Sequence, residues 1–260
     1  MNIPLFQIDA FTGKVFAGNP AAVCPLPGWI DKSLMQAIAA ENNLSETAFF
    51  VRKNSFYELR WFTPATEVDL CGHATLASAF VIMKFIEPRL TDVAFETKSG
   101  TLTVTRDGNR LTMNFPAKPP VPCTAPDDLV AGLGCTPQAV LGSDDYLAVF
   151  ATEDEVCALA PDFTALSRLN LRGVIATAPG QSADFVSRFF APGVGINEDP
   201  VTGSAHCILI PYWSARLDRT HLHALQVSKR GGELFCELKG DRVLIAGECA
   251  FYLRGEIVVP

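Results

Sequence analysis

The sequence is poor in the features that metal, nucleic-acid, nucleotide and membrane-spanning sites require. Its 260 residues include only 4 histidines, and no two of its 8 cysteines form a Cys-x-x-Cys pair, so the usual zinc spacing is missing. Acidic residues outnumber basic ones by 28 to 21, and the net charge of −7 without a Lys/Arg run argues against a nucleic-acid groove. Gly193-Val194-Gly195 lacks the third glycine of a dinucleotide fingerprint, and no Walker loop occurs. The longest apolar run, 74–86, is interrupted by Ser78 and Lys84 and is too short to cross a bilayer.

What the composition contains points to a well-buried globular protein. Apolar residues make up 48% of the chain and charged residues 19%. The N-terminus lacks the basic segment and apolar core of a signal peptide, so we expect a cytoplasmic protein with eight reduced, mostly buried thiols. His221 and His223 would share one face of a strand, but no third metal ligand lies nearby in the sequence. We therefore expect surface histidines and no metal site.

The chain contains an internal repeat at one fixed offset. Residues 60–64 (Arg-Trp-Phe-Thr-Pro) correspond to residues 188–192 (Arg-Phe-Phe-Ala-Pro), and the offset is 188 − 60 = 128 positions. The offset continues without a gap, so that Cys71 falls opposite Asp199. Self-similarity at about half the chain length indicates a duplicated domain. Two repeated turns that faced each other would make one site between two lobes.

Each half has the same order of elements. An aromatic strand runs into a proline, and a loop then leads to a small-residue turn that opens an apolar helix, expected at 75–85 and 204–213. Pro211 should kink or end the second helix. The Pro-rich segment 117–122 is the best linker, so we expect lobes at 1–117 and 118–260, and the last strand could pack on the first lobe.

The first candidate catalytic residue is Glu46. Residues 44–51 read as a strand whose alternation places Glu46 on one face with Leu44, Ala48 and Phe50. A carboxylate in such an apolar setting is rare unless it is paired or functional. One interpretation is an ion pair with an arginine such as Arg60. The other is a desolvated carboxyl group suited to proton transfer.

Two further candidates lie at the expected helix starts. His73 follows Gly72, where free backbone N–H groups could hold a carboxylate; the alternative is a core histidine. Asp199 precedes Pro200 and a helix start, so it is either a functional carboxylate or an N-cap. With Ser204 and the amides of Gly72 and Gly203, these groups would suit a cofactor-free proton-transfer enzyme with an acidic substrate.

Four motifs together resemble the phenazine-biosynthesis-like (PhzF-like) family. They are Gly18-Asn19-Pro20, Asn43-Leu44-Ser45-Glu46-Thr47-Ala48-Phe49, Cys71-Gly72-His73-Ala74-Thr75, and Glu198-Asp199-Pro200-Val201-Thr202-Gly203-Ser204-Ala205-His206-Cys207. The resemblance implies the diaminopimelate-epimerase fold. In our terms this is an α+β fold of two pseudo-symmetric lobes, each a barrel-like, mostly antiparallel sheet around a central helix. It also implies a homodimer and no cofactor.

The same resemblance assigns roles to residues. Glu46 would move a proton, with His73, Asp199 and Ser204 beside the substrate, and the substrate contacts would come from five residues: Asn19, Gly72, Thr202, Gly203 and Ser204. The related epimerases use two cysteines, and here Cys71 stands at the first position while Asp199 occupies the second. A two-thiol racemase is therefore disfavoured, although Cys71 could still line the cleft.

The expected function is a cofactor-independent isomerase of a small carboxylated metabolite, with Glu46 as general acid/base. The resemblance supports isomerase chemistry rather than phenazine synthesis. One alternative is a racemase or epimerase that uses Cys71 with Asp199 or Glu46. A second is a protein that binds small carboxylates without catalysis. No nucleic-acid or membrane partner is expected.

Overall fold

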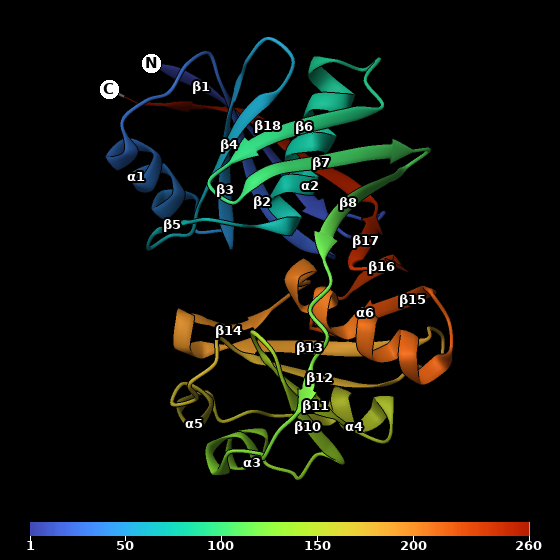
Figure 1. The fold of residues 1–260 in the computed structure, drawn as a ribbon. Helices are drawn as coiled ribbons and strands as arrows, with labels where there is room; N and C mark the ends of the chain where they lie inside the picture. The colour runs from blue at the N-terminus through green and yellow to red at the C-terminus, as the bar shows by residue number, and fades with distance from the viewer. Residues whose placement is uncertain (260) are drawn as a thin grey trace. The chain divides into compact units, whose positions relative to one another are not determined.

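The chain divides into two compact units. The computed structural model describes residues 1–259, and of these unit 1 contains residues 1–114 and 246–259 while unit 2 contains 115–245 (Figure 1). The sequence placed the division at 117/118; the compact units divide at 114/115, and the chain returns to unit 1 near residue 246. Among the described residues, no helix combines the length and apolar character needed to cross a membrane.

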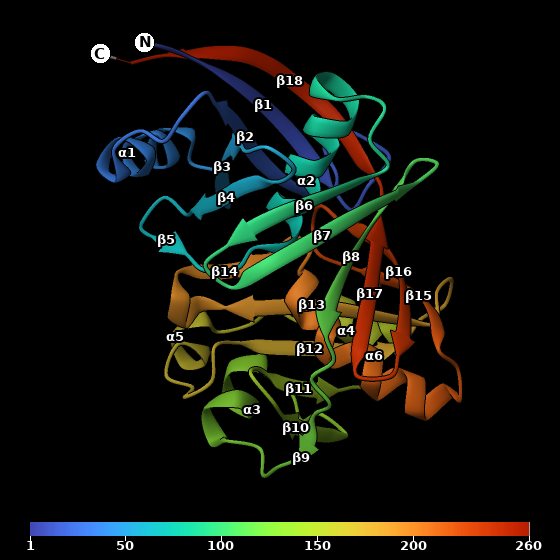
Figure 2. The same cartoon turned by 45° about the horizontal axis from the view of Figure 1, so that its top comes forward.

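Unit 1 begins with two paired strands and ends with a third beside them. Strand β18 (Cys249–Val258) runs antiparallel to β1 (Asn2–Ala10) along nearly its whole length, which is visible in Figure 2 as the red and blue strands lying side by side. The other elements of unit 1 are β2 (Asn19–Leu26), α1 (Lys32–Asn42), β3 (Glu46–Arg52), β4 (Tyr57–Phe62), β5 (Glu67–Val68), α2 (Gly72–Val81), the π-helical turn η1 (Ile82–Ile86), β6 (Asp92–Thr97) and β7 (Gly100–Asp107). Strands β8 (Arg110–Pro116) and β17 (Arg242–Gly247) contain the points where the chain passes from one unit to the other.

Unit 2 mixes short helices with strands. Its elements are β9 (Val121–Pro122), α3 (Asp127–Leu133), β10 (Ala139–Gly142), β11 (Tyr146–Val149), α4 (Glu153–Ala158), α5 (Phe163–Leu166), β12 (Val174–Pro179), β13 (Phe185–Ala191), the 3₁₀ turn η2 (Pro192–Val194), β14 (Ile196–Asp199), α6 (Gly203–Leu217), β15 (His221–Gln226) and β16 (Gly232–Lys239). The helix expected at 204–213 is thus four residues longer at its C-terminal end.

The sequence repeat is a repeat of strand topology. In unit 1, β1–β2 is antiparallel, β2–β3 parallel, β3–β4 antiparallel, β4–β6 parallel and β6–β7 antiparallel. In unit 2, the series β10, β11, β12, β13, β15, β16 has the same five pairings in the same order. A parallel pair needs a crossover connection, and each crossover here contains a helix, with α2 and α6 in equivalent positions. The matching arginines also match in role: Arg60 binds Glu67 and Arg188 binds Glu198, each through two nitrogens.

Helix α2 is buried because its sequence is apolar on every side. Eight of its ten residues are buried, and the helix packs against β1, β2 and β3 of the same unit. Its two buried hydroxyls are satisfied within the helix: Thr75 Oγ1 donates to the Cys71 carbonyl at 2.6 Å and Ser78 Oγ to the Ala74 carbonyl at 2.7 Å. The first residues of α2 are thereby fixed in position.

Helix α6 passes through Pro211 without ending, which corrects one of the two outcomes expected from the sequence. Proline has no N–H for the carbonyl four residues earlier, here that of Cys207. The backbone N–H of Lys118 donates to this carbonyl instead, at 2.9 Å. A residue of the predicted linker therefore supplies the hydrogen bond that lets the helix continue.

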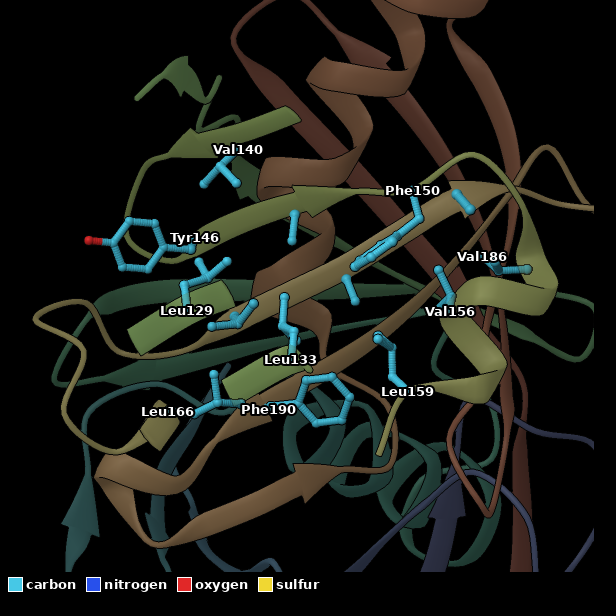
Figure 3. Close-up of a cluster of buried hydrophobic side chains, with 14 residues drawn as sticks. Leu129, Leu133, Val140, Tyr146, Phe150, Val156, Leu159, Leu166, Val186 and Phe190 are labelled. Atoms are coloured by element: carbon cyan, nitrogen blue, oxygen red, sulfur yellow. The ribbon is translucent and has the colours of Figure 1, made fainter. Parts of the chain in front are cut away.

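Each unit has its own apolar core. In unit 1 a cluster that includes Met35, Phe49 and Phe62 lies between α1 and β3 and β4. In unit 2, fourteen buried side chains from the helices α3, α4 and α5 and the adjacent strands form a second cluster (Figure 3). Tyr146 joins this cluster through its ring, while its hydroxyl points away and donates to Asn170 Oδ1 at 2.6 Å. At roughly 25 cal/mol per Å² of buried apolar surface, these clusters supply the main driving force for folding each unit.

The turn before β2 requires a glycine. Gly18 has a φ of +64°, and a Cβ atom at this position would lie 2.2 Å from the Ala10 carbonyl oxygen. Strand β2 then begins at Asn19, whose side chain is fully buried. The register brings Ala21 of β2 opposite Glu46 of β3, so this turn sets the start of the strand that neighbours the first candidate catalytic residue.

Candidate active site

Glu46 is the first residue of β3 and is only 8% exposed. Both faces of β3 are buried, so the alternation predicted from the sequence does not separate a solvent-exposed face from a buried one. The alternative interpretation of Glu46, an ion pair with Arg60, is wrong, because Arg60 binds Glu67 through Nε and Nη2 at 2.8 and 3.0 Å. The partner of Glu46 is His73, whose Nε2 lies 3.1 Å from Glu46 Oε2.

His73 lies between Glu46 and Cys71. Cys71 and His73 both lie at the start of α2, where Cys71 is the N-cap and His73 the second helical residue. Cys71 Sγ lies 3.6 Å from His73 Nδ1, so the two ring nitrogens face different neighbours. The structure therefore brings three of the predicted residues of unit 1 into one chain of contacts, thiol to imidazole to carboxylate.

The electrostatics of this cluster favour a charged imidazole and a neutral thiol. Burial raises the pKa of the Cys71 thiol to about 11, and the negative charge of Glu46 adds to the effect. Burial opposes the charged form of His73, but the neighbouring Cys71 and Glu46 outweigh it and hold the pKa of His73 well above its usual value. Since the thiol is protonated near pH 7, we attribute the imidazolium chiefly to Glu46.

The same three side chains have the donor types of a zinc-like site. Their donor atoms, one from each residue, all lie within 4.8 Å of one another. However, the His73 ring lies between the other two groups and turns a different nitrogen to each. One ion could use only one of these nitrogens, so the arrangement does not suit a metal centre that is held by all three groups.

Asp199 ends strand β14 in unit 2 and is 8% exposed. The alternative interpretation of Asp199 as an N-cap is wrong, because the N-cap of α6 is Thr202. Thr202 instead donates its hydroxyl to Asp199 Oδ2 at 2.5 Å. The structure thus brings together Asp199 and Thr202, with Gly203 as the first residue of α6 and Ser204 as the second.

Gln226 holds this loop in place and was not identified from the sequence. Its side-chain oxygen accepts the Thr202 N–H at 2.8 Å, and its nitrogen donates to the Asp199 carbonyl at 2.8 Å and to Thr202 Oγ1 at 3.2 Å. Ser228 adds a hydrogen bond to the Pro200 carbonyl at 2.8 Å. A polar residue at the end of a strand carries no sequence signal that would separate it from a surface glutamine.

Arg172 and Asp145 form a second feature that the sequence did not reveal. Asp145 is fully buried and accepts Arg172 Nε at 2.9 Å and Nη2 at 2.5 Å. Nη2 of Arg172 also donates to Ser204 Oγ at 3.0 Å, and its guanidinium lies 5.2 Å above the Phe189 ring. The available signal was an acidic pair, Asp144-Asp145, directly before a buried strand.

His206 belongs to one of the recognised motifs but is placed in the interior of α6. Its Nδ1 is 2.8 Å from the Thr202 carbonyl, which can only accept, so Nδ1 carries the hydrogen. Burial lowers the pKa of His206 to about 4, only partly offset by the bond to Thr202. A neutral, fully buried imidazole of this kind supports the loop rather than exchanging protons with a substrate.

The other predicted residues lie at the starts of elements or on a strand at the surface. Gly72 is the first residue of α2, and Asn19 is buried at the start of β2, two residues before the partner of Glu46. His221 and His223 face acidic residues of the neighbouring strand, at 3.7 Å from Glu237 and 2.8 Å from Glu233. These two histidines are surface ion-pair partners.

Comparison with known proteins matches nearly the whole chain. The sequence profile described as "Phenazine biosynthesis-like protein" matches residues 8–255. An uncharacterized isomerase of Pseudomonas aeruginosa is 53% identical over 257 residues, covering 99% of each chain. The crystal structure of a PhzF-family phenazine biosynthesis protein from Enterococcus faecalis superposes with a TM-score of 0.97 at 47% identity, covering 100% of each chain.

A more distant structure defines the fold. A predicted epimerase from Pseudomonas aeruginosa has a TM-score of 0.75 at 18% identity, covering 99% of this chain and 100% of that one. This likeness places the mixed, mostly sheet architecture in the diaminopimelate-epimerase-like fold. The close matches over nearly all of the sequence settle the family: the chain belongs to the phenazine biosynthesis-like proteins.

Proposed function

We propose that this protein is a cofactor-independent isomerase that moves a proton within a small carboxylated metabolite, with Glu46 as general acid/base. One observation carries the proposal: a carboxylate that is 92% buried, with an imidazole 3.1 Å away and, among the described residues, no arginine or lysine in an ion pair with it. The Glu46 carboxylate is thus shielded from water, and the His73 imidazole beside it can interact with its charge. The relatives named as isomerases support the same reaction class.

Glu46 would act in both halves of the reaction. Its carboxylate removes a carbon-bound proton, and the electron pair left on carbon delocalises into the adjacent unsaturated or carboxyl group of the substrate. The protonated Glu46 then returns the proton to a different carbon, so atoms and electrons balance without an oxidant or reductant. The charged His73 stabilises the Glu46 carboxylate before the first step and after the second, and holds it in one orientation.

We include Asp199 and Ser204 in the same reaction because of their chemistry. Asp199 is a buried carboxylate fixed by Thr202, and Ser204 offers a hydroxyl at the start of α6. Backbone N–H groups at a helix start would bind a carboxylate, near Gly72 in unit 1 and near Gly203 in unit 2, because the helix dipole favours an anion at each of these places. Asn19 and Thr202 are proposed as further substrate contacts.

A Cys71-dependent racemase is the second candidate. The observation that favours it is the 3.6 Å contact between Cys71 Sγ and His73 Nδ1, since an imidazole can take the proton of a thiol. Against it, the pKa of Cys71 is raised to about 11, which leaves little thiolate at neutral pH. The isomerase with Glu46 as acid/base is therefore preferred.

The test is hydrogen exchange in heavy water. A panel of small unsaturated, aromatic and amino-acid carboxylates is incubated with the protein, and carbon-bound deuterium is followed by mass spectrometry and NMR. The wild type should exchange or move one carbon-bound hydrogen of its substrate. Glu46→Gln should still fold but should lose about 10²–10⁴-fold in rate. Glu41→Gln, an exposed glutamate of α1 in the same unit, is the matched control.

Two outcomes would contradict the proposal. Exchange at the wild-type rate by Glu46→Gln would make Glu46 structural. Tight carboxylate binding without any exchange would favour a binding protein.

We also propose a cytoplasmic setting, because the site contains a free thiol, Cys71, and reducing compartments preserve such thiols.

A further inference from the structure

A buried aspartate in unit 2 holds an arginine that contacts the start of helix α6. Asp145 is fully buried, so its charge requires a partner, and Arg172 provides one through two nitrogens at 2.9 and 2.5 Å. Two such contacts fix the plane of the guanidinium. The ring of Phe189, 5.2 Å from Arg172 Cζ, supports one face of that plane.

The fixed guanidinium has a further contact that Asp145 does not require. Arg172 Nη2 lies 3.0 Å from Ser204 Oγ, and the Arg172 side chain is 40% exposed although its partner is not exposed at all. If Arg172 served only to neutralise Asp145, its contact with a partly buried hydroxyl would have no role. The contact instead places a charged donor against a residue proposed to touch the substrate.

The chemistry of the two groups determines where the Ser204 hydrogen points. A guanidinium has only donors, so Ser204 Oγ must accept in this contact. Its own hydrogen is then directed away from Arg172 and is available to an acceptor. A donor from a charged group also polarises the hydroxyl and strengthens the bond that it gives.

We propose that Arg172, held by Asp145, is a positioning residue that fixes the Ser204 hydroxyl as a hydrogen-bond donor to an anionic oxygen of the substrate, such as a carboxylate. This inference rests on the proposed function for the identity of the ligand class. It assigns Arg172 no direct contact with the reacting atoms. Asp145 acts one step further away, by fixing the arginine.

The competing explanation is attraction by charge alone. Several carboxylates lie close to Arg172, since Asp145, Asp144 and Asp199 all favour its charged form. An incoming anion therefore meets little net positive charge at this place. Orientation of Ser204 is the effect that remains, and it depends on the shape of the guanidinium as well as on its charge.

The experiment measures binding of benzoate and of its uncharged amide, benzamide, by NMR titration. Benzoate presents a planar carboxylate and cannot take part in the proton shift, so its binding is independent of turnover. The first variant is Arg172→Lys, which keeps a positive charge beside Asp145 but cannot bind Asp145 and Ser204 together through a planar fork. The second is Ser204→Ala, and the third combines the two substitutions.

We expect benzoate to bind Arg172→Lys and Ser204→Ala about 3- to 10-fold more weakly than the wild type, as the loss of one hydrogen bond predicts. The double variant should be no weaker than Ser204→Ala, because the arginine acts through the serine. Benzamide affinity should change less than about twofold in all three. Ser204→Thr should restore benzoate affinity, since it restores the hydroxyl.

The controls separate positioning from folding. Arg168→Gln removes an exposed arginine of the same unit that is paired with Asp128 at 2.6 Å, and should leave benzoate binding unchanged. Should Arg172→Lys fail to fold, the paired variant Arg172→Gln with Asp145→Asn removes the guanidinium and the buried charge together. It should show the same selective loss of benzoate affinity.

Several results would overturn the inference. These are the absence of benzoate binding to the wild type, wild-type affinity in Arg172→Lys, additive losses in the double variant, and equal losses for benzamide. Failure of the proposed function is a different result, seen as normal exchange by Glu46→Gln while the Arg172 and Ser204 variants still lose benzoate. Loss of exchange by Glu46→Gln with no change in benzoate binding by Arg172→Lys would leave the function and remove this inference.

Discussion

His73 Nε2 lies 3.1 Å from Glu46 Oε2, and the two side chains are 7% and 10% exposed. This ion pair is buried, and neither group can exchange its partner for water without moving. The imidazole is attached to the first turn of α2, whereas the carboxylate belongs to β3. The pair therefore links a helix start to a strand and fixes the orientation of the proposed acid/base.

The stability that this pair provides should depend on pH. Because the pKa of His73 is raised in the folded state, its contribution is complete below the unfolded value of about 6.5 and is lost as the pH rises through the folded pKa. His73→Asn should lower the free energy of unfolding by about 3–5 kcal/mol near pH 6, the usual cost of breaking a buried pair. The difference from the wild type should shrink as the pH rises through the folded pKa of His73.

Urea denaturation at several pH values measures this difference. His221→Asn is the control, because the His221 side chain is 78% exposed and its ion pair with Glu237 is long. A destabilisation by His73→Asn that stays the same size over the whole alkaline range would show that the imidazole is held by packing and not by charge.

Cys71 should not be the catalytic base. With a pKa of about 11, only about one thiol in 10⁴ is ionised at pH 7. Cys71→Ala should therefore keep activity within about tenfold of the wild type, and iodoacetamide should modify the exposed Cys123 well before Cys71. Mass spectrometry of alkylated peptides follows the two sites. Loss of activity by several orders of magnitude would support the racemase instead.

The sequence was sufficient to find the candidate residues but not their partners. An acidic residue in an apolar run identified Glu46, and the motif at the helix start identified His73. The alternative of an ion pair between Glu46 and Arg60 was wrong because several cations were compatible with Glu46 by sequence. In the structure Arg60 binds Glu67, which Lys32 and Lys98 also bind. Which cation reaches which carboxylate depends on strand register, and single-sequence patterns do not determine it.

The fold was predictable to the same extent. The offset of 128 residues implied a duplication, and the two units repeat five strand pairings in order. Strand β2 was harder to recognise, because Pro20 and Pro25 lie within it and proline usually marks a turn or an edge. Helix α6 passes Pro211 because Lys118, distant in the sequence, donates to the carbonyl that the proline leaves without its usual partner.

We also propose a homodimer that uses the exposed side of strand β18. Phe251, Tyr252 and Leu253 are consecutive and 37–45% exposed, so both faces of the strand present apolar side chains to solvent. Phe16, 72% exposed, packs edge-on against Tyr252 with ring centroids 5.6 Å apart. A strand that exposes apolar side chains to solvent on both faces is typical of an interface, and a second copy of the chain would cover these side chains.

Light scattering after gel filtration should give twice the chain mass of 28.1 kDa for the wild type and a smaller mass for Tyr252→Lys. The lysine would place a charge within the apolar contact. Lys239→Tyr, a charge-removing change at an exposed strand end, is the control and should leave the mass unchanged. A monomeric wild type, or an unchanged mass for Tyr252→Lys, would contradict this interface.

Gln226 should be needed for the geometry of Asp199 more than for contact with any ligand. It is 99% buried, and its amide satisfies the Thr202 N–H and the Asp199 carbonyl, two backbone groups on either side of a proline-containing turn. Gln226→Leu keeps most of the volume but leaves both backbone groups without these partners, which should lower the free energy of unfolding by about 1–3 kcal/mol.

Gln226→Glu keeps the acceptor for the Thr202 N–H but cannot donate to the Asp199 carbonyl, and it adds a buried negative charge next to Asp199. We therefore expect the glutamate variant to be the less stable of the two and to regain stability as the pH is lowered, since protonation restores a neutral donor. Thermal unfolding at pH 5 and pH 8 compares them, and equal stability of the two variants at both pH values would show that the amide is not what holds the Asp199 loop.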